Sequence, residues 1–322
     1  MDIDDRLAFI IGHYKSGSTW LAHVLALAPQ IVSVRECHVF RYAREAENFS
    51  AANDILFKSS AWGMGGIKSY PRHWVSNMTR GIRTATGFAK YAAALPTNDV
   101  PTSMHDLGLW RQLRLQRRMS NAIDETEYCK LLFAELLERF NPDAYIVEKT
   151  PTNVYELDLL KKIFPRAKLI SIHRDGRDVV VSDMHHLRRA YGREEEFSQR
   201  VHKWVNAMEA EKQGAVNYDI HQLSYEQLQF EPQETVAQVL DHLGLYHDKH
   251  FVERLINGAA FEVSSGGRVA GVEDTSSFQR KGVVGDWRNV FSDSDIREFS
   301  KVAGPLLVEL GYEKSADWRT WT

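Results

Sequence analysis

Residues 7–27 read LAFIIGHYKSGSTWLAHVLAL, and this stretch decides the fold. The apolar run at 7–11 has the length of a buried strand, and the residues after Trp20 have the pattern of a helix. The polar turn between them, Lys15-Ser16-Gly17-Ser18-Thr19, therefore lies at a helix N-terminus. Unpaired backbone N–H groups and the positive end of the helix dipole make such a turn a cradle for phosphate.

The position of the lysine separates two classes of phosphate loop. The loop of nucleoside-triphosphate-binding proteins ends in Gly-Lys-Ser/Thr. Here Lys15 stands two residues before Gly17. We therefore expect a nucleotide whose terminal group is not a γ-phosphate.

Composition and charge are those of an ordinary globular protein, with 322 residues, 43% hydrophobic and 26% charged. The formal net charge of −3 gives no overall basic field for nucleic acid. Cys37 and Cys129 are too few for a disulfide scaffold and fit a reducing compartment. The acidic N-terminus has no signal-peptide pattern, and no apolar run is long enough to span a bilayer, so we expect a cytoplasmic protein.

Short apolar runs alternate with helical patterns along the chain, which is typical of a parallel sheet covered on both faces. The expected strands are 7–11, 144–147, 168–172 and 219–223, with a further one ending before Glu36. The expected helices are 17–27, 128–140, 154–164, 178–191, 232–243, 249–256 and 293–310. We expect one P-loop-like, three-layer α/β domain over 1–322, with a helical insertion at 41–140 and a long loop, ordered on binding, at 258–286.

A second polar group of residues, HRDGRDVVVS at 173–182, follows the expected strand 168–172. Open α/β sheets place ligands at the carboxyl ends of their strands, where Arg174 lies. Ser182 comes eight residues after Arg174, about two helical turns on. An arginine fork and a hydroxyl can together bind one phosphate.

A third group, FQRKGVVGDWRN at 278–289, combines Arg280 and Lys281 with glycines. Basic side chains and backbone N–H groups in such a loop can wrap a phosphate. The three groups, in this order, resemble the cofactor motifs of sulfotransferases that use 3′-phosphoadenosine 5′-phosphosulfate (PAPS). The last is similar to the Arg-Lys-Gly-x-x-Gly-Asp-Trp-Lys-Asn element of the cytosolic members, with Arg288 for the second lysine.

The resemblance implies the following cofactor contacts. The 5′-phosphosulfate would be cradled by Lys15, Ser16, Gly17, Ser18 and Thr19, and Trp20 would offer an aromatic face to adenine. The 3′-phosphate would be held by Arg174, Ser182, Arg280, Lys281 and Gly282. Tyr225 and Phe261 match adenine-contacting aromatics, although each could instead be a core residue.

The catalytic base departs from the cytosolic pattern, in which a histidine follows Lys-Thr. Here Pro151 follows Lys149-Thr150, which resembles the Glu-Lys-Thr-Pro of other branches, including tyrosylprotein sulfotransferases. Those branches carry a glutamate base 21 residues beyond the leading basic residue of the loop, which is Glu36 in this chain. His38 is the next candidate and His13 the third.

The implied reaction moves a sulfuryl group from PAPS to a hydroxyl of a small-molecule, lipid or glycan acceptor, leaving adenosine 3′,5′-bisphosphate (PAP). Glu36 would take the hydroxyl proton, while Lys15, with Lys149 as a second cation, would stabilise charge on the bridging oxygen. Two alternatives stay open: a P-loop nucleoside or sugar kinase, and a non-catalytic PAP-binding protein. No catalytic metal is expected, because the adjacent His185 and His186 cannot share one site on a helix.

Acceptor choice and assembly depend on other segments. We expect residues 41–140 to shape the acceptor site, with aromatics that either line it or pack, namely Phe40, Tyr42, Trp62, Tyr70, Trp74 and Trp110. The dimer element of cytosolic members, Lys-x3-Thr-Val-x3-Glu, falls at 288–297 and is degenerate here. Asp293 places a charge where an apolar contact belongs, so we expect no dimer of that kind, and the oligomeric state stays open.

Overall fold

The computed structural model describes residues 3–34, 36–58, 109–140, 144–192, 194–265, 267–274, 281–316 and 318. Within them, one sheet has the strand order β2-β3-β1-β4-β5, and every pair of neighbouring strands is parallel. The strands are β1 (Leu7–Gly12), β2 (Ile31–Val34), β3 (Tyr145–Lys149), β4 (Lys168–His173) and β5 (Ile220–Ser224). The parallel sheet predicted from the sequence is thus confirmed.

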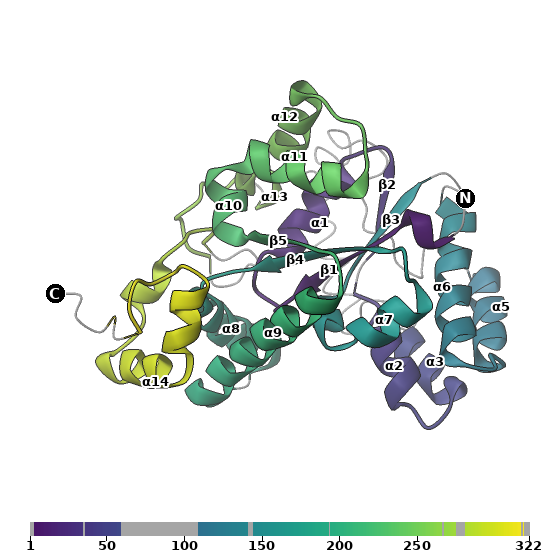
Figure 1. Cartoon of the computed structure of the whole chain (residues 1–322), viewed down its shortest axis with the longest axis horizontal. Helices are drawn as coiled ribbons and strands as arrows, with labels where there is room; N and C mark the ends of the chain where they lie inside the picture. Colours follow the sequence, from purple (N-terminus) through teal and green to yellow (C-terminus); the bar gives the residue numbers. More distant parts are fainter. Residues whose placement is uncertain are drawn as a thin grey trace, which may run out of the picture.

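Helices cover both faces of this sheet and give the three layers seen in Figure 1. One face carries α1 (Ser18–Ala26), α10 (Tyr225–Phe230), α11 (Pro232–Leu243) and α12 (Lys249–Gly258). The other carries α2 (Val39–Glu45), α3 (Phe49–Lys58), α5 (Leu109–Ser120), α6 (Glu125–Phe140), α7 (Leu157–Ile163), α8 (Gly176–Tyr191), α9 (Phe197–Asn217) and α14 (Asp293–Glu309). The short helix α13 (Phe261–Ser264) lies within the loop predicted at 258–286.

Strand β1 is buried along its whole length and sits at the centre of both cores. Successive side chains of a strand point to opposite faces. Accordingly Phe9 packs in the larger core, against the rings of Phe40, Phe133 and Phe164, while Ile10 packs in the smaller core beneath α1. A six-residue apolar run without alternation is what a strand covered on both faces requires.

Several helical segments differ from the sequence prediction. Helix α10, directly after β5, was not predicted. Helix α9 was not predicted, although its Val201, Trp204 and Met208 are buried at helical spacing in the larger core. The helix predicted at 154–164 is divided into a 3-10 turn, η3 (Pro151–Tyr155), and α7. Glu156, between them, has φ −117° and ψ 15°, outside the helical region, and this interrupts the helix.

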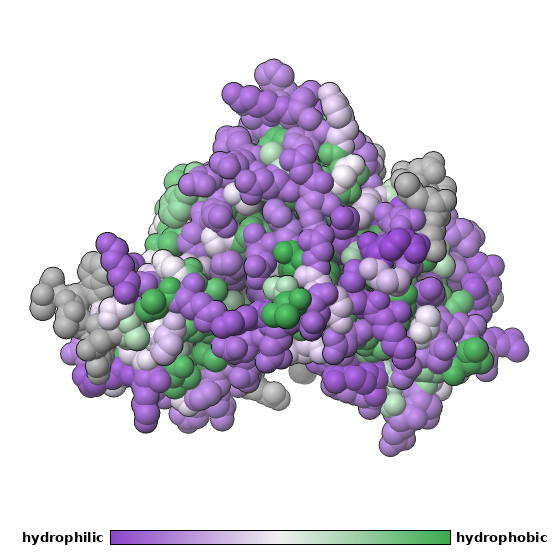
Figure 2. Space-filling model, in the orientation of Figure 1, coloured by the Kyte–Doolittle hydropathy of each residue, from purple (hydrophilic) through white to green (hydrophobic). Residues whose placement is uncertain are grey.

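The described parts of the 41–140 segment are helical and pack in the larger core together with the sheet. Phe40 is fully buried and Tyr42 is 8% exposed, so these two aromatics pack. Trp62, Tyr70 and Trp74, and the side chain of Trp110, lie outside the described residues. The face of the molecule in Figure 2 is mainly hydrophilic, with hydrophobic residues in small groups. Among the described helices, none has both the length and the apolar composition to cross a membrane.

Candidate active site

The predicted site residues gather at one edge of the sheet. Each strand delivers one of them at or just beyond its carboxyl end: Lys15 after β1, Glu36 after β2, Lys149 in β3, Arg174 after β4 and Tyr225 after β5. The chain leaves β1 toward β2 and later crosses to β4 on the other side. Ligands of open α/β sheets bind at such a reversal of strand order, beside the carboxyl ends.

The turn between β1 and α1 has the geometry of an anion cradle. Lys15 (φ 69°) and Gly17 (φ 92°) are both left-handed, and α1 begins directly after them. Left-handed residues in a turn let neighbouring N–H groups point into one concavity. The Ser16 side chain is fully buried, and its hydroxyl has no hydrogen-bond partner among the described residues. A phosphate or sulfate oxygen fits these unsatisfied donors.

Gly17 also allows the turn to approach Tyr225 closely. A Cβ atom on Gly17 would lie 2.5 Å from the Tyr225 ring, closer than atoms can approach. The loop after β1 and the start of α10 after β5 are therefore in direct contact. This contact brings a predicted phosphate residue and a predicted adenine residue together.

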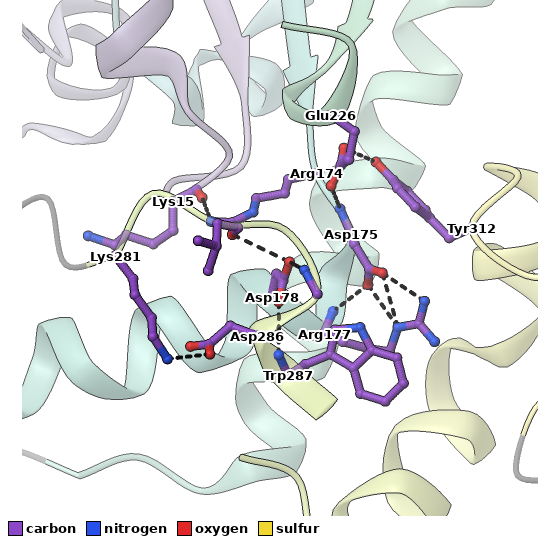
Figure 3. Close-up of polar contacts among 12 residues, drawn as sticks. Lys15, Arg174, Asp175, Arg177, Asp178, Glu226, Lys281, Asp286, Trp287 and Tyr312 are labelled. Atoms are coloured by element: carbon purple, nitrogen blue, oxygen red, sulfur yellow. Dashed lines mark hydrogen bonds and ion pairs between the residues drawn. The ribbon is translucent and has the colours of Figure 1, made fainter. Parts of the chain in front are cut away.

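Arg174 joins all three motifs, as Figure 3 shows. Its guanidinium donates to the carbonyl oxygens of Lys15 at 3.5 Å and Val283 at 2.8 Å. The same group lies 3.4 Å from the Asp178 carboxylate and 4.4 Å from the centroid of the Tyr225 ring. Segments that are far apart in the sequence thus meet at one cation. Its Nε atom is buried and has no partner among the described residues, so a donor remains for a ligand.

The third motif is held in place by residues of the second that the sequence did not single out. Asp178 accepts hydrogen bonds from the backbone N–H groups of Gly285 at 2.6 Å and Trp287 at 3.0 Å. The guanidinium of Arg177 is bound by Asp175 and Glu313 and lies 4.1 Å from the centroid of the Trp287 ring. Burial raises the pKa of Asp178, while Arg174 and the two N–H groups oppose that effect. The loop is therefore docked on α8 by charge and by hydrogen bonds.

The remaining residues predicted for the 3′-phosphate are only partly gathered. Lys281 donates to Asp286 at 2.7 Å, and Gly282 (φ 65°) approaches Phe261 so closely that a Cβ there would lie 2.6 Å from the ring. Ser182 lies on α8 and is half-buried. Arg280 lies outside the described residues.

The aromatic residues predicted for adenine lie around the same loops. Trp20 donates its indole N–H to the carbonyl oxygen of Ala259 at 2.9 Å and meets Tyr225 edge-on, with ring centroids 5.7 Å apart. Tyr225 is 8% exposed and carries Arg174 on its ring. Phe261 is half-buried, with the guanidinium of Arg268 5.2 Å from its ring centroid.

Glu36 lies between two basic side chains. Its carboxylate forms an ion pair with the Lys149 ammonium and lies 3.7 Å from Nε2 of His38. The chain is not extended here, because β2 ends at Val34 and His38 is left-handed at φ 53°. The directions of the Glu36 and His38 side chains are therefore set by the conformation of this turn and not by the alternation of a strand. Burial lowers the pKa of His38, and the Glu36 carboxylate opposes that effect.

His13, the third candidate base, is buried at 4% exposure. Its Nδ1 contacts the carbonyl oxygen of Tyr14, and burial lowers the pKa of its imidazole to about 4. Near neutral pH this imidazole is neutral, but it is enclosed beneath the loop.

Glu148 is the main polar residue of the site that the sequence did not single out. It is fully buried in β3, next to Lys149, and accepts hydrogen bonds from Cys37, Thr150 and Asn153. Its sequence signal was its place at the start of the Glu-Lys-Thr-Pro element, which was interpreted only for the residue after Thr150.

Comparisons with known proteins agree with this geometry. A sequence model of the Sulfotransferase family matches residues 8–249. Sulfotransferase 1B1 of Mus musculus is 24% identical over 185 residues, which cover 49% of this chain and 62% of that protein. Sulfotransferase 2A1 of Homo sapiens is 23% identical over 217 residues, which cover 60% of this chain and 68% of that protein. The match thus spans less than two thirds of the mouse relative.

Solved structures share the architecture. The mouse sulfotransferase SULT7A1 complexed with PAP has a TM-score of 0.54 at 15% identity, covering 94% of this chain and 85% of that one. The sulfotransferase STF9 from Mycobacterium avium has a TM-score of 0.53 at 14% identity, covering 96% and 77%. These likenesses show the fold and, at such identities, nothing more.

Proposed function

Because the chain belongs to the sulfotransferase family, we propose that it transfers a sulfuryl group from PAPS to the hydroxyl group of a small-molecule, lipid or glycan acceptor. One observation carries the proposal. Arg174 hydrogen-bonds to Lys15 of the phosphate loop and to Val283 of the basic glycine loop. This meeting of the three motifs that resemble PAPS-binding elements supports a single cofactor site.

The residues present fit PAPS on grounds internal to the structure. The buried Ser16 hydroxyl and the N-terminus of α1 offer unsatisfied donors to the 5′-phosphosulfate. Arg174 and Lys281 supply positive charge for the 3′-phosphate, and Trp20, Tyr225 and Phe261 supply aromatic surface for adenine. PAPS supplies the sulfuryl group, whose bond to the bridging phosphate oxygen breaks as the acceptor oxygen bonds to sulfur.

The chain's own residues have three tasks in this reaction. Glu36 accepts the proton that the acceptor hydroxyl gives up. Lys15 and the α1 N-terminus stabilise the charge that builds on the bridging oxygen. Lys149 is a candidate second cation for the same oxygen, and its ion pair also orients the Glu36 carboxylate. Positioning and electrostatics supply the acceleration, as they do in phosphoryl transfer.

The acceptor site is proposed to be formed with the 41–140 segment. Helix α2 starts directly after His38, so the segment begins beside Glu36, the proposed catalytic base. Arg44 of α2 forms an ion pair with Glu156, at 2.7 Å, and this pair ties α2 to the turn after β3. An acceptor hydroxyl that reaches Glu36 therefore approaches beside this segment.

The test is an acceptor screen with sulfur-labelled PAPS and the purified full chain. Phenols, sterols, lipid alcohols and glycans are offered in turn, and we expect acceptor-dependent transfer of label together with release of PAP. Calorimetry with PAP and with ATP plus Mg²⁺ runs in parallel. Tighter binding of ATP than of PAP would favour the kinase alternative. Tight binding of PAP with no transfer to any acceptor would favour a binding protein.

A further inference from the structure

Glu148 is a carboxylate at a position where the fold calls for an apolar side chain. In the sheet register it lies opposite Phe9 on one side and Val34 on the other, and its side chain is fully buried. Burying a carboxylate is costly unless hydrogen bonds compensate for lost water. A buried carboxylate in the strand next to β1, which leads into the phosphate loop, and beside Lys149 suggests a role in the reaction.

The hydrogen bonds of Glu148 run to the segment that carries the base. Its Oε1 accepts from the backbone N–H of Cys37 at 3.1 Å and from the Thr150 hydroxyl. Its Oε2 accepts from the side-chain amide of Asn153 at 3.1 Å. The Thr150 hydroxyl in turn accepts from the N–H groups of Cys37 at 3.1 Å and His38 at 3.4 Å.

In the sequence, Cys37 lies between Glu36, the proposed catalytic base, and His38, the alternative base. Its backbone N–H donates to Glu148 and Thr150, and these hydrogen bonds attach the turn after β2 to β3 and the residue that follows it. Glu36 and His38 project from either side of this attachment, and their side chains meet at 3.7 Å. Thr152 adds a contact to Nδ1 of His38 at 3.3 Å, from the same 3-10 turn as Asn153.

We propose that Glu148 is a positioning residue, which through Cys37 and Thr150 holds Glu36 and His38 in the geometry needed for proton abstraction. The proposal rests on the sulfotransferase function proposed above. It concerns the ionised carboxylate, because all three of its partners donate to it. A protonated carboxyl would present a hydrogen where it now accepts one, and it would compete with the Thr150 hydroxyl for the same bond.

The charges around Glu148 place this change near neutral pH. Burial raises the pKa of Glu148 to about 7, against the opposing effects of Thr150, Cys37 and the Lys149 ammonium. The Cys37 thiol, the other titratable group in contact, has its pKa raised by burial, so it stays neutral. Burial lowers the pKa of His38, which therefore titrates below its ordinary range. The hydrogen bonds that the ionised Glu148 accepts from Cys37 and Thr150 are thus present above about pH 7 and are lost as the pH falls.

Three variants and one control test the proposal. Glu148→Gln keeps the shape but removes the charge. Thr150→Val removes the bridging hydroxyl, and Thr150→Ser restores it. The control is Glu211→Gln, which removes another buried carboxylate, 3% exposed, on α9 beside the opposite sheet edge at β5.

The measurements are kcat against pH at saturating PAPS, the PAP dissociation constant, and amide hydrogen exchange of residues 36–38 in the unliganded protein. For wild type we expect kcat to fall below about pH 7 and the protection factors of amides 36–38, which correct exchange for its intrinsic pH dependence, to fall over the same range. For Glu148→Gln and Thr150→Val we expect kcat lowered about 10- to 100-fold, faster exchange at 36–38 and unchanged PAP binding. The inflection near pH 7 disappears in Glu148→Gln, and Thr150→Ser and Glu211→Gln resemble wild type.

The proposal is overturned if Glu148→Gln keeps the wild-type pH profile, or if its exchange at residues 36–38 matches wild type. Exchange needs neither acceptor nor turnover. A wild-type chain that transfers nothing would therefore defeat the proposed function, while the exchange data would still decide whether Glu148 holds the 36–38 turn.

Discussion

The guanidinium of Arg174 donates a hydrogen bond to the carbonyl oxygen of Val283 at 2.8 Å, although 109 positions of sequence separate them. The same guanidinium reaches the Lys15 carbonyl at 3.5 Å. Hydrogen bonds that involve an ionised group are about twice as strong as neutral ones. Arg174 therefore both stabilises the arrangement of the two loops and presents positive charge between them (Figure 3). Its substitution should affect the nucleotide more than the fold, since Asp178 also holds the Gly285–Trp287 backbone.

Arg174→Ala should weaken PAP binding by roughly 1.5–3 kcal/mol, the range for hydrogen bonds to charged groups. Isothermal titration calorimetry measures the change. Arg174→Lys, which keeps the charge but not the fork, should fall between the variant and wild type. Adenosine 5′-monophosphate, which lacks the 3′-phosphate, should lose much less affinity. Equal losses for the two nucleotides would reject Arg174 as a 3′-phosphate residue.

Gly17→Ala should impair PAP binding, because the new methyl group would lie 2.5 Å from the Tyr225 ring and the backbone is left-handed. Backbone strain of this kind costs about 1–3 kcal/mol. We expect a lower melting temperature together with weaker PAP binding. The matched control is Gly244→Ala, which is also left-handed at φ 69° but has open space around the added methyl group. It should lose stability only; a Gly17→Ala protein that binds PAP normally would contradict the cradle.

Lys15→Ala should lower kcat by about 10²- to 10³-fold, the usual loss when a preorganised charge is removed from a transition state. Folding should change little, because lysine and alanine share the same cost at a left-handed position. Steady-state kinetics at saturating PAPS, with a thermal melt as control, provide the check. Near-normal kcat would show that the loop has been assigned wrongly.

Glu36→Gln should lower kcat by roughly 10²- to 10⁴-fold with little change in PAP affinity, because it preserves shape but removes the proton acceptor. His38→Ala should have a smaller effect, since His38 contacts only one oxygen of Glu36, and Lys149 still pairs with the other. The two variants are compared at one pH with one acceptor. A nearly normal Glu36→Gln beside an inactive His38→Ala would transfer the role of base to His38.

The surface at residues 288–297 should not mediate a dimer of the cytosolic type. Arg288 packs its guanidinium on the neighbouring Trp287 ring, 4.5 Å from the centroid, and Asp293 begins α14. A charge at a small interface must be desolvated on association. Light scattering of wild type and of an Arg288→Ala, Asp293→Ala double variant should give the same mass. A dimer that dissociates in the double variant would refute this.

Local sequence signals predicted much of the fold. Helix α11 begins at Pro232 and ends before Gly244, as predicted, because a proline at the first turn and a glycine after the last mark helix ends in any context. The expected parallel sheet follows from apolar runs that only a strand covered on both faces can bury. The phosphate loop is equally local, since strand, turn and helix are consecutive in 7–27.

Other features had weaker local signals. Helix α9 lacks a side-chain cap at Glu196, and a single buried stripe holds it in place. The break at Glu156 depends on how the turn after β3 packs. The sequence alone does not predict either feature, because tertiary contacts outweigh helix propensity there.

The sequence by itself determined the fold class and the family, because these depend on order and spacing along the chain. Only the tertiary structure decided that Arg174 meets Val283, that Lys149 binds Glu36, and that the buried Glu148 accepts a hydrogen bond from Cys37, next to Glu36. The strand order β2-β3-β1-β4-β5 brings these residues together at one edge. Contacts between distant segments depend on that order, and no local pattern of residues encodes it.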